Sequence, residues 1–217
     1  MFMSKEKTAL ILLNGEKPSR GLLESHWQIS DLRVCADGAA AICDEYGLYP
    51  DVILGDLDSL KQDTKKHLPL SQIIEAANQD FTDGEKAIQF CINEGVGRIS
   101  LFGALGKRSD HALYNLGLLR TFHREVAELT ICSDDETVLL ISGEKTFSSS
   151  PGTRISLLPI FGRVENVTTY GLKYPIKTEY LELGYSSSVS NSFIDESVTV
   201  SFSSGLLLVV IGSQNKI

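Results

Sequence analysis

Residues 51–59, with the sequence DVILGDLDS, contain the pattern that decides how the first part of the chain folds. The apolar run Val52–Leu54 ends at Gly55, and Asp56 and Asp58 then follow one residue apart. An apolar run bounded by turn residues is typical of a buried strand in a parallel sheet, and such sheets bind ligands beyond the carboxyl ends of their strands. Two carboxylates in that place could hold a hard cation, and an Asp-rich surface turn is the other interpretation.

Apolar runs alternate with helical patterns on both sides of this stretch, which predicts a doubly wound, mostly parallel α/β sheet. Further strands are expected at 8–13, 32–36, 71–75, 98–102 and 128–133, and helices at about 39–46, 61–67, 82–95 and 109–122. The first strand ends at the turn pair Asn14–Gly15. Thr82 and Glu85 have the spacing of a capping box, which predicts a helix start.

The pattern changes after Asp134, where short strand-like segments follow one another without a long helical period. They lie at 136–141, 146–147, 154–159, 164–169, 179–183, 197–202 and 206–211. This spacing is typical of a β sandwich. The sequence therefore predicts two domains, an α/β domain at 1–134 and an all-β sandwich at 135–217. The serine-rich segment 186–192 is interpreted as a surface loop, with contact to a small ligand as the alternative.

Composition and charge narrow the class of protein. The 217 residues carry a formal net charge of -8, which argues against a nucleic-acid partner because phosphate-backbone binding needs clustered lysine and arginine. The four cysteines form no C-x-x-C pair, so free buried thiols are expected and a zinc site is not. The apolar run 9–13 is too short for a membrane span. We expect a cytoplasmic protein without a membrane partner.

Polar side chains and glycines gather at the predicted carboxyl edge of the sheet. Asp37, Asp56, Asp58, Asp80 and Asp83 would make this edge strongly negative, and a cation such as Mg²⁺ carrying a polyphosphate would relieve the repulsion.

The segment GALGKRSDH, at 103–111, could contact the phosphates through glycine N–H groups and through Lys107 and Arg108. Lys86 lies one helical turn after Asp83, on the same side of its helix. His111 is interpreted either as a polar contact at this edge or as the cap of the next helix.

The motifs in their order along the chain resemble those of the thiamine pyrophosphokinase family. They are ADGAA at 36–40, PDVILGDLDS at 50–59, QDFTDGEKA at 79–87, GALGKRSDH at 103–111 with Asn115, VENVTTYGLKYPI at 164–176 and SVSNSF at 188–193. The resemblance implies transfer of a pyrophosphoryl group from ATP to the hydroxyl of thiamine with Mg²⁺, giving thiamine diphosphate and AMP. It also implies a homodimer in which each thiamine site lies between the α/β domain of one subunit and the β domain of its partner.

The resemblance also implies roles for individual residues. The metal ligands would be Asp56, Asp58 and Asp83. The catalytic groups would be these three carboxylates together with Lys86 and Arg108. The substrate-binding residues would be Asp37, Gln79, Thr82, Asp110, Asn115, Ser188, Ser190 and Asn191.

Of these, Ser190 and Asn191 would reach in from the partner subunit. The last third of the chain has no tryptophan, so the resemblance does not identify an aromatic partner for the thiamine ring. The general base stays open among Asp58, Asp83 and Asp110.

Two other functions are compatible with parts of the pattern. A haloacid-dehalogenase-like phosphatase would use Asp56 as its nucleophile and Asp134–Asp135 as its second acidic pair. That nucleophile normally ends the first strand of its sheet, whereas at least two strands are expected before Asp56. The other alternative is a non-catalytic module that binds a nucleotide or thiamine.

Overall fold

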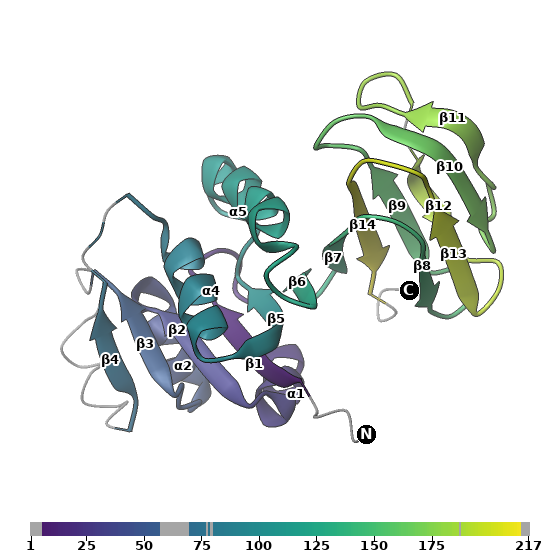
Figure 1. Ribbon diagram of the computed structural model, residues 1–217. Helices are drawn as coiled ribbons and strands as arrows, with labels where there is room; N and C mark the ends of the chain where they lie inside the picture. Colours follow the sequence, from purple (N-terminus) through teal and green to yellow (C-terminus); the bar gives the residue numbers. More distant parts are fainter. Residues whose placement is uncertain (1–5, 57–69, 77, 79, 187, 214–217) are drawn as a thin grey trace, which may run out of the picture. The chain divides into compact units, whose positions relative to one another are not determined.

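The computed structural model describes residues 6–56, 70–76, 78, 80–186 and 188–213. The chain divides into two compact units, unit 1 at Met1–Asp134 and unit 2 at Asp135–Ile217 (Figure 1).

Unit 1 contains parallel strands connected through helices. Its described strands are β1 (Lys7–Leu12), β2 (Leu32–Ala36), β3 (Val52–Gly55), β4 (Gln72–Glu75), β5 (Val96–Phe102) and β6 (Glu128–Cys132). They pair in parallel in the order β6-β5-β1-β2-β3-β4. Its described helices are α1 (Arg20–Ile29), the 3-10 turn η1 (Asp37–Ala39), α2 (Ala40–Tyr46), α4 (Asp83–Asn93) and α5 (Ser109–Phe122).

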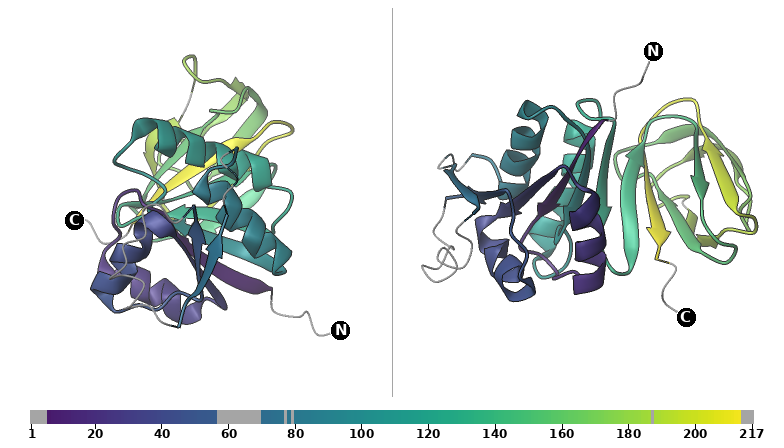
Figure 2. Two further views of the ribbon diagram at one scale, coloured as in Figure 1. Left: turned by 90° about the vertical axis from the view of Figure 1, so that its left-hand side faces the viewer. Right: turned by 90° about the horizontal axis from the view of Figure 1, so that it is seen from below.

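Helices cover both faces of this sheet, so the predicted doubly wound α/β arrangement is confirmed (Figure 2). Helices α1 and α2 lie on one face, where Leu23 and Cys43 pack against Leu10 and Leu12 of β1. Helices α4 and α5 lie on the other face. The inner strands are mostly apolar because both of their faces are buried, as in β3, whereas β4 at the end of the sheet is largely exposed.

Helix α1 was not expected from the sequence. Ser19 is its N-cap, and the Ser19 side chain accepts a hydrogen bond from Leu22 N. Leu23 and Trp27, one turn apart, are buried on its inner side, so Trp27 is a packing residue. The expected helix at 61–67 lies outside the described residues.

Unit 2 is a β sandwich, as the sequence predicted. One of its sheets has the order β12-β9-β14-β7, and the other has the order β11-β10-β13-β8. The strands are β7 (Glu136–Ile141), β8 (Lys145–Ser148), β9 (Arg154–Leu158), β10 (Val164–Tyr170), β11 (Lys177–Leu181), β12 (Ser188–Ser192), β13 (Ser197–Ser201) and β14 (Leu207–Gly212). Side chains from both sheets, including Leu157, Val167 and Val200, form one buried core.

The serine-rich segment is a strand and not the expected surface loop. Residues 188–192 form β12, which pairs antiparallel with β9 through an irregularity between Ser188 and Asn191. Ser190 takes a left-handed backbone conformation with φ +58° within this irregularity. A bulge of this kind lets Ser188 and Asn191 both point into the protein although they are three positions apart.

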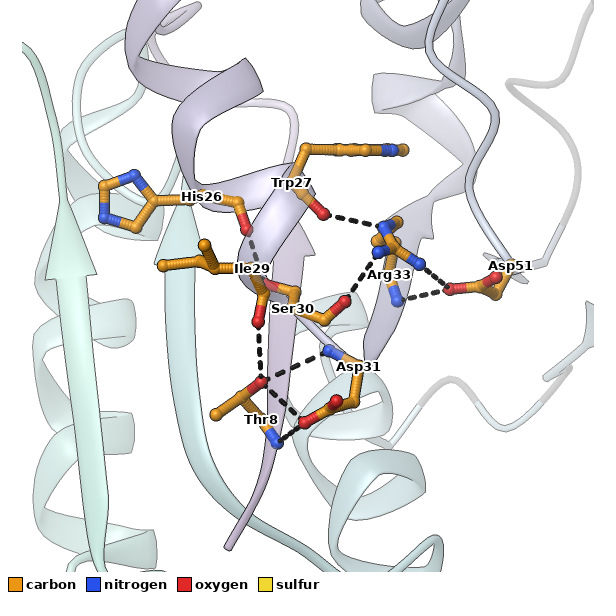
Figure 3. A network of polar contacts seen from close by, with 8 residues as sticks. All are labelled: Thr8, His26, Trp27, Ile29, Ser30, Asp31, Arg33 and Asp51. Carbon is orange, nitrogen blue, oxygen red and sulfur yellow. Dashed lines mark hydrogen bonds and ion pairs between the residues drawn. The ribbon is translucent and has the colours of Figure 1, made fainter. Parts of the chain in front are cut away.

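The amino edge of the sheet in unit 1 is fixed by a network of charged and polar groups (Figure 3). Arg33 donates to the carbonyl oxygens of Trp27 at 2.9 Å and Ser30 at 2.6 Å. Asp51 accepts a hydrogen bond from Arg33 N at 2.7 Å. Asp31 accepts one from Thr8 N at 2.9 Å. These bonds satisfy N–H and C=O groups where the strands begin.

All four cysteines are free and buried, as expected. Burial raises the pKa of the Cys91 thiol to about 12. Within the described ranges, the protein has no helix with the length and apolar character needed to cross a membrane.

Candidate active site

The strand order of unit 1 reverses between β1 and β5. From β1 the chain first adds β2, β3 and β4 in one direction across the sheet. It then returns to the other flank of β1 and adds β5 and β6 in the opposite direction. The carboxyl ends at such a switch point are where doubly wound sheets bind ligands. Backbone hydrogen bonds join the two loops here, from Gly15 N to Gly103 O at 2.7 Å and from Glu16 N to Leu105 O at 2.6 Å.

The close approach of these loops requires glycine. Gly103 has φ +62°, and a Cβ atom at this position would lie 2.1 Å from Leu13 O. A Cβ atom on Gly15 would lie 2.2 Å from Gly103 O. Both distances are far inside van der Waals contact, so any larger residue would push the loops apart.

Several of the predicted acidic residues follow the strands at this edge. Asp56 comes directly after β3 and is exposed, and Asp37 opens η1 directly after β2. The predicted ligand Asp58 and the predicted phosphate contact Gln79 lie outside the described residues.

Helix α4 begins with the predicted capping box. Thr82 Oγ1 accepts from Glu85 N at 3.3 Å, and Glu85 Oε2 accepts from Thr82 N at 2.9 Å. Interaction with Glu85 raises the pKa of the Tyr114 hydroxyl on α5. The start of α4 is therefore fixed by its capping box, and Gly84 in its first turn packs against Leu118 of α5, where an added Cβ atom would be 2.9 Å away.

Asp83 and Lys86 lie together on the first turn of α4, as their spacing predicts. Lys86 Nζ is 3.9 Å from Asp83 Oδ1, and the exposed fractions of the two side chains are 11% and 46%. The Lys86 stem is thus packed against protein, which limits where its ammonium can go. A cation and a carboxylate at this edge are what a metal-bound polyphosphate requires.

Arg108 and Asp110 form a two-pronged ion pair at the start of α5. Arg108 Nη2 lies 2.6 Å from Asp110 Oδ2, and Arg108 Nε lies 3.1 Å from Asp110 Oδ1. Hydrogen bonding to Arg108, assisted by the backbone N–H of His111, lowers the pKa of Asp110 to about 2. The interpretation of His111 as the helix cap was wrong, because Arg108 is the N-cap of α5.

Asn115 holds the loop between β5 and α5. It is buried, and its Nδ2 donates to Ala104 O at 2.7 Å. Its Oδ1 lies beside Gly84 of α4, where an added Cβ atom would be 3.3 Å away. The structure therefore gives this predicted substrate contact a packing position between the loop and α4.

Asn14 is a residue at this edge that sequence reasoning missed. Its main-chain O and its Oδ1 both accept hydrogen bonds from Lys107 Nζ at 3.1 Å. On its other side, the Asn14 amide packs against Gly38: a Cβ atom added to Gly38 would lie 2.7 Å from Asn14 Nδ2. The pair Asn14–Gly15 was interpreted only as a turn, although it follows a parallel strand just as Asp37 and Asp56 do.

In unit 2 the predicted thiamine residues lie on β12. Asn191 is buried, accepts from Tyr174 N at 3.0 Å and donates to Tyr174 O at 2.7 Å and Ser188 Oγ at 3.1 Å. Ser190 is exposed, and its N–H donates to Ser156 Oγ at 3.0 Å. Asn191 thus fixes the backbone at Tyr174, a residue that is 63% exposed.

The donor atoms at the edge of unit 1 suit a metal that keeps few protein ligands. Across the described part of the chain, no three His, Cys, Asp or Glu side chains come together as a metal-binding group. Asp56 and Asp83 supply hard carboxylate oxygens. Mg²⁺ typically binds through one or two carboxylates together with substrate phosphates, so these residues fit it better than they fit a zinc or calcium cage.

A doubly wound sheet with acidic and basic groups at its carboxyl edge is typical of a domain that binds a phosphorylated ligand, and here a β sandwich follows it. Two family models match the chain. The model described as "Thiamin pyrophosphokinase, catalytic domain" matches residues 23–131, and the model described as "Thiamin pyrophosphokinase, vitamin B1 binding domain" matches residues 142–207. The chain belongs to the thiamin pyrophosphokinase family.

Named relatives are similar over nearly the whole chain. Thiamine pyrophosphokinase 2 of Arabidopsis thaliana is 32% identical over 93% of this chain and 85% of its own length. Thiamine pyrophosphokinase of Bacillus subtilis is 25% identical over 94% of this chain and 98% of its own length.

Solved structures share the fold. A crystal structure of the Bacillus subtilis protein superimposes with a TM-score of 0.85 at 24% identity, covering 96% of this chain and 100% of that one. The yeast protein gives a TM-score of 0.83 at 21% identity, covering 95% of this chain and 86% of that one. These comparisons do not support the phosphatase alternative. The structure also places Asp56 after the third strand along the chain and not after the first.

Proposed function

We propose that the carboxyl edge of unit 1 is the site at which this chain, a thiamine diphosphokinase, transfers the pyrophosphoryl group of ATP to thiamine. The products are thiamine diphosphate and AMP. The proposal for the site rests on one observation, the presence of Asp83, Lys86, Arg108 and Asp110 at the starts of two helices that pack together where Gly84 lies beside Asn115 and Leu118. Helices connected in this way can present charges of both signs to one polyphosphate.

Asp56 and Asp83 would hold Mg²⁺ together with the phosphates of ATP, and Asp58 is their third predicted partner. When bound, the metal neutralises charge on the phosphate oxygens. Lys86 and Arg108 contact the same oxygens and stabilise the charge that develops as AMP leaves.

Asp110 serves to orient Arg108. With its pKa near 2 it is a weak base, because a useful general base has a pKa close to the working pH. Asn115 and the capping box of Thr82 keep the loop and the helix in place around these groups.

In unit 2, Ser190 and the exposed ring of Tyr174 would contact thiamine. Asn191 and Ser188 lie behind them and fix the backbone from which the Tyr174 ring projects. We expect a homodimer in which these residues complete the site of the partner subunit. Four buried free thiols suit a reducing compartment, which supports a cytoplasmic location.

The test of the activity is an assay of AMP release from ATP with and without thiamine and Mg²⁺. We expect AMP and thiamine diphosphate in equal amounts, formed only when all three components are present. Binding of ATP and thiamine without any product would instead support the non-catalytic binding module.

Mixing two inactive variants tests the shared site. If each site takes unit 1 from one chain and unit 2 from the other, a mixture of Asp56→Asn and Tyr174→Ala chains recovers about a quarter of the wild-type activity, because half of the dimers have one intact site. If each site lies within one chain, no mixed dimer has an intact site and the mixture stays inactive.

A further inference from the structure

Among the described residues, the cationic side chains of Lys86, Lys107 and Arg108 lie at the carboxyl edge of unit 1, and their partners differ in charge. Lys86 faces the carboxylate of Asp83, and Arg108 is paired with Asp110. Lys107 instead donates hydrogen bonds to two neutral oxygens of Asn14. The first two pairs are neutral as wholes, whereas the pair of Lys107 and Asn14 keeps a full positive charge.

The backbone at Lys107 is strained in a way that fixes this charge in place. Lys107 has φ +53°, a left-handed conformation that glycine adopts freely and lysine rarely does. Strain of this kind persists where the surroundings enforce it, often at functional sites. The neighbouring glycine, Gly106, also has a positive φ and has no room for a side chain beside Glu16.

Asn14 links Lys107 to the middle of the edge. It belongs to the loop after β1, its amide packs on Gly38 after β2, and its two oxygens hold the ammonium that comes from the loop after β5. The charge of Lys107 therefore lies at the switch point itself. An ammonium has three N–H donors, so a third can serve a ligand after Asn14 has accepted two.

We propose that Lys107 is a further phosphate-contacting residue for ATP and that Asn14 is its positioning residue. The inference rests on the proposed function, because it takes the triphosphate to be bound at this edge. It assigns to Lys107 a contact with the phosphate chain and none with adenine or thiamine. The triphosphate stays anionic with Mg²⁺ bound, and Lys107 can contact it without first giving up a carboxylate partner among the described residues, because its hydrogen bonds go to neutral oxygens of Asn14.

The direct test is the Kd of the full-length protein for α,β-methylene-ATP with Mg²⁺, measured by calorimetry. Lys107→Gln removes the charge and keeps a donor of similar length, and we expect the Kd to rise about tenfold, the scale of one charged hydrogen bond. Lys107→Arg keeps the charge and should recover most of the affinity. The Kd for thiamine should not change in either variant.

Two further variants separate ligand contact from a role in folding. Lys107→Gly should raise the Kd equally and also raise the thermal midpoint, because glycine relieves the left-handed strain. Asn14→Asp is isosteric and would neutralise the ammonium, so it should raise the Kd in the same direction. Lys7→Gln is the matched control, because Lys7 starts β1 at the opposite edge and donates to Glu94 O.

The inference is overturned if Lys107→Gln binds the analogue as tightly as the wild type. It is also overturned if Lys107→Gly lowers the thermal midpoint and weakens the analogue and thiamine equally, since that pattern indicates a structural residue. The proposed function fails separately, if the wild type binds the analogue but forms no AMP from ATP and thiamine.

Discussion

The two edges of the parallel sheet in unit 1 contain the same kinds of charged residue and use them differently. At the amino edge, Asp31 and Asp51 accept hydrogen bonds from main-chain N–H groups of neighbouring strands, and Asp51 also lies 3.3 Å from Arg33 Nη1 (Figure 3). At the carboxyl edge, Asp83 and Asp110 face charged side chains. A carboxylate that bonds the main chain of a neighbouring strand is part of the scaffold even where a cation also contacts it, as at Asp51. A carboxylate beside a cationic side chain at a helix start can instead exchange that cation for a ligand.

Residue type alone therefore does not separate structural from functional aspartates in this protein. Their partners do. The sharpest way to test this difference is to make the same substitution at both edges and to measure turnover and stability separately.

Asp56→Asn should have the largest effect. We expect turnover to fall about a thousandfold, because the neutral amide is a poor ligand for Mg²⁺ and the charge on the phosphates is left without compensation. The exposed position of Asp56 means that folding should be unaffected. The rate of AMP formation at saturating substrates is the measurement, and circular dichroism checks the fold.

The matched control is Asp51→Asn at the amino edge, which should keep turnover within about twofold because its bonds are structural. Near-normal turnover of Asp56→Asn, or equal losses in the two variants, would contradict the division between the edges.

Gly103→Ala tests whether the carboxyl edge depends on backbone contact. A Cβ atom would meet Leu13 O and also strain a left-handed backbone, so the free energy of unfolding should fall by about 3 kcal/mol. Gly117→Ala is the control, since no described atom lies within 4 Å of its added Cβ atom in α5, and it should gain about 0.5–1 kcal/mol. Urea unfolding followed by the fluorescence of Trp27, the single tryptophan, reports on unit 1. A stable Gly103→Ala protein would show that the loops can separate.

Arg33→Lys tests the amino edge. Lysine cannot reproduce the fork that reaches the carbonyl oxygens of Trp27 and Ser30, so we expect a loss of about 1–2 kcal/mol in the same urea experiment, with turnover unchanged. Arg20→Lys is its control, because Arg20 forms an exposed pair with Glu24 and should cost less than about 0.5 kcal/mol. A clear fall in the turnover of Arg33→Lys would contradict this prediction, because it would show that a residue of the amino edge takes part in function.

The smallest effect concerns pH and the pair of Arg108 and Asp110. The folded pKa of Asp110, about 2, is below its ordinary value of 3.8, so the pair's contribution to stability is complete above the ordinary value and is lost as the pH falls toward 2. Because the pair is exposed, its contribution is small and decreases further with salt. A carboxyl carbon NMR titration should give a midpoint near 2 in the wild type and close to the ordinary value in Arg108→Gln. A wild-type midpoint at the ordinary value would show that the pair does not form in solution.

Features that depend on local sequence could be predicted. The capping box at Thr82 is decided within four residues, and the expectation that polar groups follow parallel strands located Asp83, Lys86 and Arg108 from the sequence alone. The strands of unit 1 were predictable because burial on both faces leaves long apolar runs.

Features that depend on tertiary contact could not be predicted from the sequence. Segment 188–192 is polar and short, and it becomes a strand only because β9 pairs with it and the bulge at Ser190 lets Asn191 turn inward. Helix α1 is an exception, because its N-cap Ser19 and the helical spacing of Leu23 and Trp27 are local sequence signals that were overlooked. Asn14 was missed because a turn and a binding loop have the same residues at this position, and only the contact with Lys107 distinguishes them.

The bond between Asn14 and Lys107 joins residues 93 positions apart in the chain, and the loops on which they lie are joined over a similar separation. Contacts this distant in sequence form slowly, because a long intervening segment must be ordered before they can close. The loops after β1 and β5 can meet only once α4 has carried the chain back across the sheet. During refolding, helical circular dichroism should therefore return before nucleotide binding does. A chain that is still being synthesised cannot close this site until β5 has emerged.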